Sequence, residues 1–163
     1  HRAAGLDVAT YRIRAAEHFV VEPVQTLHQL LEAHSLGQRI FGENDEMPEE
    51  EARGYISQLS RDGARIHRFL VRERSSGAAV AQGGLNIYPE LKTGLMWGGG
   101  PRPEARGRGA YRATLNARIE LARRSGVETL ALYAREGESL PIMKALGARL
   151  GNRMHFWSRD PLR

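Results

Sequence analysis

The sequence predicts an α+β fold, with a mixed, mostly antiparallel sheet of six to seven strands flanked by about four helices. The first observation behind this prediction is the order of the expected elements along the 163 residues: strand, helix, helix, three strands, helix, strand, helix and strand. Three successive strands joined by short turns are typical of an antiparallel meander. The second observation is the strand–helix–strand unit that follows, because its crossover connection places the two strands parallel.

The N-terminal part is expected to contain a tail, one strand and two helices. Residues 1–10 show no regular pattern and are assigned to a loose tail, which leaves residues 11–163 as a single domain of ordinary length. Apolar and charged residues alternate in residues 11–16, as they do in a strand. Pro23 suits the first turn of a helix, and residues 48–62 have the pattern of a second, acidic helix.

The rest of the chain alternates between strand-like and helical patterns, with turn residues between them. The expected strands are residues 64–73, 78–88, 91–97, 127–133 and 149–158, and the expected helices are residues 110–124 and a short helix that begins at Ser139. The strands around Leu95 and Leu130 should be parallel neighbours. We expect a gap to open between them beyond Trp97.

Composition and charge exclude several classes of protein. The net charge is +5, but 22 of the 24 basic residues are arginines spread along the whole chain, which is typical of a GC-rich genome and not of a basic nucleic-acid tract. We therefore expect no nucleic-acid partner. No apolar run approaches the ~18 residues of a membrane span, so no membrane partner is expected. Because cysteine is absent and the histidines show no paired spacing, we expect no metal and a cytoplasmic location.

The chemistry of the chain concentrates in the loop between the strand that ends near Trp97 and the helix that begins at Ala110. Backbone N–H groups at a helix N-terminus, together with the helix dipole, attract anions. Gly107 and Gly109 allow a phosphate to approach the backbone, while Arg106 and Arg108 can add charged contacts. The spacing excludes a P-loop and a dinucleotide fingerprint. A flexible glycine turn and an Arg-Gly nucleic-acid tract are the alternatives.

The run Pro103-Glu104-Ala105-Arg106-Gly107-Arg108-Gly109 resembles motif A of the GNAT superfamily of N-acetyltransferases. Arg106 and Gly109 match the motif, and its last position is occupied by Tyr111. The resemblance extends over residues 92–148 and implies a GNAT-like domain with acetyl-CoA as co-substrate. The residues that it implies for coenzyme binding are Gly99, Gly100, Pro101, Arg106, Gly107, Arg108, Gly109, Ala110 and Tyr111.

The resemblance also implies that an amine attacks the thioester carbonyl directly. Backbone N–H groups at Gly99 and Gly100, where the family has a β-bulge, would then stabilise the oxyanion. Many members carry a tyrosine that protonates the leaving thiolate, at the position that Met143 occupies in this chain. Tyr133 and Ser139 are the substitute proton donors.

The acceptor is expected to be an amine of a small molecule or of a protein. Glu43 and Asp45 lie between the two N-terminal helices, which line the acceptor side in this family, and Trp97 is a candidate wall of the pocket. A solvated acidic loop and core packing are the alternatives for these residues. The alternative function is a non-catalytic acyl-CoA-binding domain, such as one half of a tandem pair. A homodimer or a tandem-domain partner stays open.

Overall fold

A seven-stranded sheet organises the part of the chain that the computed structural model describes, which is residues 1–12, 16–42 and 45–155. The strands follow the order β2-β3-β4-β5-β6-β1-β7, and every neighbouring pair is antiparallel except β5 and β6. Their bounds are β1 (Arg2–Asp7), β2 (Phe19–Pro23), β3 (Ile66–Glu73), β4 (Ala79–Tyr88), β5 (Thr93–Pro101), β6 (Thr129–Ala134) and β7 (Arg149–Arg153). The mixed, mostly antiparallel sheet is as predicted.

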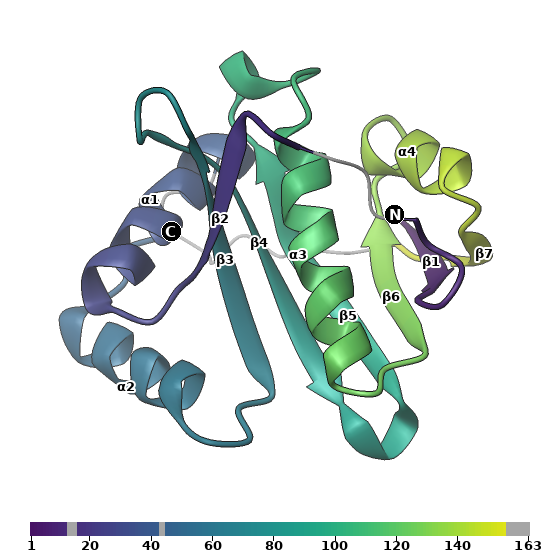
Figure 1. The fold of residues 1–163 in the computed structure, drawn as a ribbon, viewed down its shortest axis with the longest axis horizontal. Coiled ribbons are helices and arrows are strands. Elements are labelled where there is room, and N and C mark those ends of the chain that lie inside the picture. Colours follow the sequence, from purple (N-terminus) through teal and green to yellow (C-terminus); the bar gives the residue numbers. More distant parts are fainter. Residues whose placement is uncertain (13–15, 43–44, 156–163) are drawn as a thin grey trace, which may run out of the picture.

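Helices cover both faces of this sheet (Figure 1). The helices of the described residues are α1 (Leu27–Phe41), α2 (Glu49–Ser60), α3 (Ala110–Arg124) and α4 (Ser139–Ala145), with short 3-10 turns at Pro89–Leu91 and Pro103–Ala105. Figure 1 shows α3 across the near face and α1 with α2 behind the sheet, while α4 lies beside β6 and β1. The α+β class with four helices is confirmed.

The first helix begins later than predicted. Pro23 ends β2 and does not open α1, whose N-cap is Thr26. The Thr26 hydroxyl accepts a hydrogen bond from the backbone N–H of Gln29 at 3.2 Å, and the Gln29 side chain accepts one from the backbone N–H of Thr26 at 3.1 Å. This capping box satisfies free N–H groups at the helix start, which proline cannot do.

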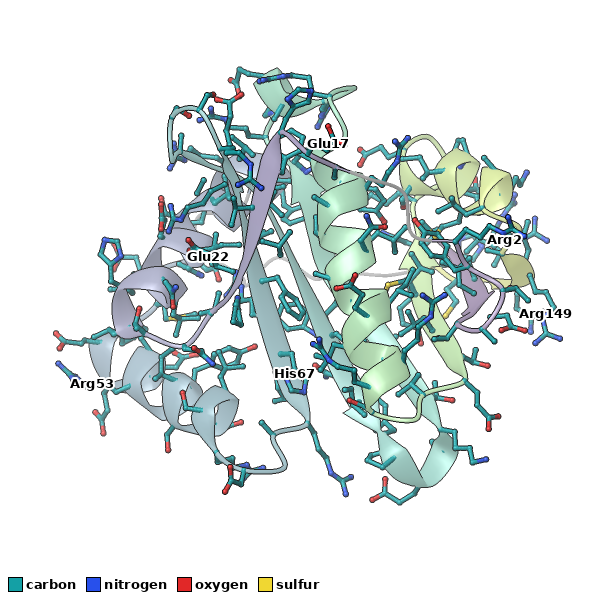
Figure 2. All side chains as sticks on the ribbon, viewed as in Figure 1. Arg2, Glu17, Glu22, Arg53, His67 and Arg149 are labelled. Atoms are coloured by element: carbon teal, nitrogen blue, oxygen red, sulfur yellow. The ribbon has the colours of Figure 1, made fainter. Side chains whose placement is uncertain are left out.

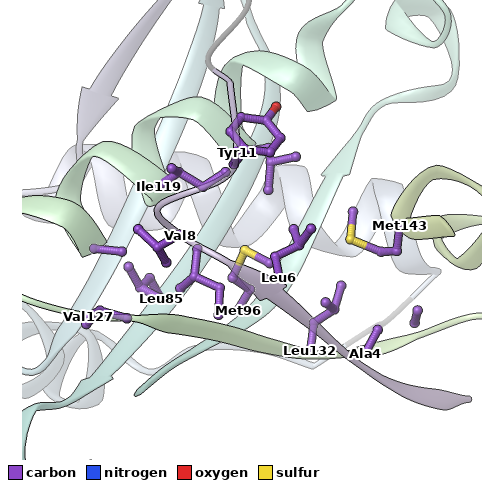
Figure 3. Packing of buried hydrophobic residues seen from close by; sticks show 14 of the residues in the cluster. Ala4, Leu6, Val8, Tyr11, Leu85, Met96, Ile119, Val127, Leu132 and Met143 are labelled. Carbon is purple, nitrogen blue, oxygen red and sulfur yellow. The ribbon is translucent and has the colours of Figure 1, made fainter. Parts of the chain in front are cut away.

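The N-terminal tail was predicted wrongly, because residues 2–7 form the inner strand β1 between β6 and β7. Ala4 and Leu6 are buried in the cluster that also contains Leu132 and Met143 (Figure 3). Gly5 interrupts the apolar alternation here, so the local pattern is weak. The partners of β1 lie more than a hundred residues away along the chain. A strand that depends on such distant pairing has little signal in its own sequence.

Two other expected strands are only partly covered. Residues 13–15 of the expected strand 11–16 lie outside the described residues. The last expected strand begins at Arg149 as predicted, and β7 pairs with β1 up to Arg153, but residues 156–163 also lie outside the described part.

The parallel strands β5 and β6 separate where the sequence predicted a gap. Their pairing runs from Thr93 opposite Thr129 to Met96 opposite Leu132 and then stops, although both strands continue. Beyond this point the two strands diverge (Figure 1). On the other side of β5, Trp97 pairs with Gly84 of β4 and Gly100 with Gln82, so β5 contains one extra residue. This is a β-bulge, and it lies at the mouth of the gap.

Candidate active site

A cavity of about 480 Å³ opens where β5 and β6 separate. Its walls reach both faces of the sheet, because α1 contributes His34 and Phe41 and α3 contributes Arg118. The other lining residues are His1, Gly37, Gln38, Arg68, Gln82, Met96, Trp97, Gly98, Gly99, Tyr111, Leu132, Tyr133, Arg135, Glu138 and Ser139. A ligand that enters from the α3 side can therefore meet one that enters from the α1 side.

Gly99 and Gly100 of the bulge lie in tight surroundings. A Cβ atom on Gly99 would lie 2.9 Å from Arg118 Nη1, on the α3 side, and one on Gly100 would lie 3.0 Å from Ile40 Cγ2, on the α1 side. Gly98 has a φ of 54°, which also favours glycine. Gly99 lines the cavity, whereas Gly100 packs against α1. Because β5 has no β6 partner beyond Met96, its backbone edge faces the gap there.

The coenzyme loop, defined as residues 103–111, presents backbone N–H groups around the start of α3. The N–H of Arg106 donates to the carbonyl of Pro103 at 3.2 Å and is therefore engaged. The N–H groups of residues 107–111 have no acceptor among the described residues. Gly107 and Gly109 have φ of 73° and 95°, left-handed values that favour glycine and that recur in backbone anion sites. The loop thus has the geometry of an anion site.

Arginine side chains surround this loop. The Arg108 guanidinium forms a salt bridge with Glu73, at the end of β3. Hydrogen bonds from Arg108 and Ser76 hold the pKa of the Glu73 carboxyl below its usual range. Arg106 is exposed. Arg102, which the sequence analysis did not single out, has a buried Nε atom with no hydrogen-bond partner among the described residues.

Both substitute proton donors lie at the cavity. Tyr133 of β6 and Ser139 at the start of α4 line it, and the Ser139 hydroxyl accepts a hydrogen bond from the backbone N–H of Arg135 at 2.9 Å. Met143 does not line the cavity and is fully buried in the main core cluster (Figure 3). Its place in the structure is that of a core residue.

Of the three acceptor-pocket residues predicted from the sequence, the described part of the structure places only one at the cavity. Trp97 lines the cavity, and its Nε1 atom donates to Asn86 Oδ1 at 2.7 Å. Asp45 is exposed and does not line the cavity; its backbone carbonyl accepts hydrogen bonds from His34 and Gln38, which do. Glu43 lies outside the described residues.

The sequence analysis missed two buried arginines in the cavity wall. Arg68 of β3 donates from Nε and Nη2 to Gln82 Oε1 at 3.0 and 2.6 Å, and its guanidinium carbon lies 5.8 Å from the centre of the Trp97 ring. Arg118 of α3 is 2% exposed, and its Nε donates to the carbonyl of Thr114 at 3.2 Å. Burial lowers the pKa of both guanidinium groups. One signal was present: Arg118 falls on the apolar stripe of its helix.

No group of three or more His, Cys, Asp or Glu side chains gathers in the described part of the chain in a way that could hold a metal ion. Within the same residues, no helix has both the length and the apolar character needed to cross a membrane.

The chain matches no protein-family model and no curated protein sequence, but it resembles many solved structures. An acetyltransferase from Trypanosoma brucei superposes with a TM-score of 0.71 at 20% identity, over 86% of this chain and 99% of that one. An aminoglycoside acetyltransferase from an uncultured soil metagenomic sample gives 0.72 at 12% identity, over 87% and 96%. A GCN5-related N-acetyltransferase from Sphaerobacter thermophilus gives 0.71 at 17% identity, over 92% of this chain and 48% of that one.

Proposed function

Because the chain has the fold of the GCN5-related N-acetyltransferases, we propose that it is an acyl-CoA-dependent N-acetyltransferase that moves an acetyl group from acetyl-CoA to an amine. One observation carries the proposal: the cavity between the separated strands β5 and β6 adjoins both the β-bulge and the coenzyme loop. The loop suits the phosphates of coenzyme A, and the gap admits its thioester arm. The acceptor amine belongs to a small molecule or to a protein.

The coenzyme is held by backbone groups in this mechanism. The N–H groups of residues 107–111 bind its phosphates, supported by the charges of Arg106 and Arg108. No metal is required, since these groups and the start of the α3 helix supply positive potential. The free edge of β5 at Gly98 and Gly99 faces the thioester in the gap.

The transfer step is a direct attack. The neutral amine nitrogen forms a bond to the thioester carbonyl carbon, and the carbonyl oxygen becomes an oxyanion that N–H groups of the bulge stabilise. The C–S bond then breaks and leaves coenzyme A as a thiolate. The proton that the nitrogen loses passes to solvent, and Tyr133 or Ser139 supplies one to the sulfur. A thiol with a pKa near ~8.5 is also a tolerable leaving group without help.

Turnover tests this proposal. The protein is mixed with acetyl-CoA and a panel of amines that includes amino acids, polyamines and short peptides, and release of free thiol is followed. We expect release that depends on at least one amine, with an acetylated product of the matching mass. Absence of both thiol release and acetyl-CoA binding would contradict the proposal.

A second candidate is a non-catalytic acyl-CoA-binding domain within a tandem pair. It is supported by the length comparison, since the chain spans about half of the Sphaerobacter enzyme. Stabilisation by acetyl-CoA without turnover of any amine would favour it.

A further inference from the structure

Two buried positive charges in the cavity wall have no acidic partner. Neither Arg68 nor Arg118 forms a salt bridge with a carboxylate among the described residues. Buried charges in proteins are normally paired, because removing an ion from water is costly. The exposed arginines labelled in Figure 2, such as Arg53 and Arg149, instead point away from the molecule into solvent.

Arg118 shows the lack of a partner more clearly than Arg68 does. Its Nη2 atom is buried and has no hydrogen-bond partner among the described residues, while the guanidinium packs beside Gly99 of the bulge. Its other neighbour is the Tyr111 ring, whose centre lies 5.8 Å from the guanidinium carbon. Both neighbours are uncharged. The Nη2 donor of Arg118 is thus left for a ligand atom at the place where β5 and β6 begin to separate.

Arg68 approaches the cavity from the α1 side. Its hydrogen bonds go to the neutral amide of Gln82, and the Trp97 ring lies against it. A neutral amide leaves the positive charge uncompensated. Gln82 is itself fixed, since Gly37 of α1 lies so close that a Cβ there would come within 2.6 Å of the Gln82 Nε2 atom.

The remaining charges of the lining do not compensate these arginines. Arg135 adds a further positive charge, with its guanidinium 5.6 Å from the centre of the Phe41 ring. The only carboxylate among the described lining residues is that of Glu138, which is 62% exposed and lies 3.8 Å from Arg135. The cavity therefore has an excess of positive charge where an amine is to react.

We propose that the cavity takes a reactant that carries a carboxylate near its reacting centre, bound by Arg118 on the α3 side, with Arg68 adding positive charge from the α1 side. The proposal rests on the acyl-transfer function and narrows its substrates. A carboxylate matches the fork of donors on a guanidinium, and its negative charge would offset part of the buried positive charge in the cavity wall. Polycationic acceptors such as aminoglycosides or polyamines are disfavoured, because like charges repel in a site with little water.

We do not assign the coenzyme phosphates as the anion that binds at Arg68 and Arg118. The backbone of Arg118 lies nine residues after Gly109, roughly 13 Å along the axis of α3, and its guanidinium reaches back to Tyr111 and Gly99 but does not contact Gly107 or Gly109. The phosphate groups belong at the start of that helix, beside the coenzyme loop. Arg68 belongs to the opposite face of the sheet, with Gln82 and α1.

The carboxylate has two sources, and the experiment separates them. In the first arm, acetyl-CoA reacts with 4-aminobutyrate or phenylalanine and with the corresponding amides, compared at equal concentrations of the unprotonated amine. In the second arm, succinyl-CoA and butyryl-CoA are compared with one neutral amine. We expect kcat/KM to favour the carboxylate in one arm by about 10- to 100-fold, the usual strength of a charged hydrogen bond.

Variants test whether the preference for a carboxylate depends on the two arginines. Arg118→Gln should remove most of the preference and Arg68→Gln should reduce it, whereas the exposed Arg53→Gln should keep it. Gln82→Glu is nearly isosteric and provides Arg68 with an internal carboxylate, so it should reduce the preference without loosening the fold. This variant keeps the test informative where an arginine variant does not fold.

A binding measurement decides the matter even without turnover. Calorimetry at saturating coenzyme A should show that 4-aminobutyrate or succinate binds at least ~10-fold more tightly than the matching amide. Equal affinity for acid and amide, together with equal kcat/KM in both arms, would overturn the carboxylate site. The acyl-transfer function would survive that result if amines still react, and it fails separately if acetyl-CoA neither binds nor reacts.

Discussion

The two sides of the cavity are built in different ways. On the α3 side, the coenzyme loop is a single run of nine residues, and its free N–H groups come from that run alone. On the α1 side, Arg68, Gln82 and Trp97 come from three strands, and His34 and Gln38 come from α1. The proposed coenzyme side is local in the sequence, whereas the proposed acceptor side exists only after the sheet and α1 have packed together.

This difference has a physical basis. A phosphate can be bound by backbone groups, so the loop needs glycines at fixed spacing and a helix start, which are visible in sequence. An acceptor must be bound by side chains, whose positions depend on strand register. Binding of the coenzyme can thus be achieved by one loop, while specificity for the acceptor requires side chains from several elements.

The largest expected effect is the loss of coenzyme binding in Gly109→Glu. Acetyl-CoA at 100 times its Kd should stabilise the parent by ~2.7 kcal/mol, which raises Tm by about 5–10 °C. The variant places a carboxylate beside the phosphates and should show no such rise. Thermal unfolding with and without acetyl-CoA measures it.

Gly126→Glu is the matched control. Gly126 also has positive φ, at 70°, and open space around it, so the substitution carries a similar backbone strain far from the loop. It should keep the full rise in Tm. A normal rise in Gly109→Glu would show that the coenzyme side is not this local loop.

The next effect concerns protonation of the leaving thiolate in the cavity, between the α3 side and the α1 side. Tyr133→Phe should lower kcat by about 10²-fold if Tyr133 protonates the leaving thiolate, the usual contribution of a general acid. Met143→Leu should stay within a few-fold, because Met143 lies in the core. Steady-state kinetics on both variants measures this. A large fall for Met143→Leu with Tm and coenzyme affinity intact would contradict a purely structural role for Met143.

A third prediction tests the α1 side of the cavity, which is built from several strands. In Gly84→Ala, the new Cβ overlaps the Trp97 ring, and the indole must move away from Arg68. Overpacking of this kind costs ~1–3 kcal/mol, and the acceptor KM should rise while the acetyl-CoA affinity is unchanged. Gly54→Ala in α2 has open space and should instead stabilise slightly. Equal effects of both variants on Tm and KM would contradict the packing described here.

The smallest effect is a pH dependence at His67, the neighbour of Arg68 on β3. Burial lowers the pKa of His67 below 6.5, so the unfolded chain binds this proton more readily than the folded one. The free energy of unfolding should therefore fall as pH drops below about 6.5, the unfolded value. His67→Gln should flatten this part of the Tm profile. Because His67 is half-exposed, we expect a change below the ~2–4 °C that 1 kcal/mol makes in a domain of this size. An unchanged profile would mean that the imidazole stays hydrated.

The sequence by itself determined the elements whose signals are local. The α3 helix and the meander of β3, β4 and β5 carry regular periodicity and clear turn residues, and the coenzyme loop is defined by glycine spacing. The parallel placement of β5 and β6 followed from the helical crossover that joins them. These features depend on residues that are neighbours along the chain, so their physical cause is visible before folding.

Only the tertiary structure decided the rest. β1 gives no local signal, and it becomes a strand because β6 and β7 pair with it on both sides. Arg68 is one of 24 basic residues without a local signal, and Arg118 carries only its position on an apolar helix stripe, so strand register and helix packing are what place both in the cavity wall. Burial and charge pairing are properties of distant contacts, and a single sequence does not contain those contacts as local patterns.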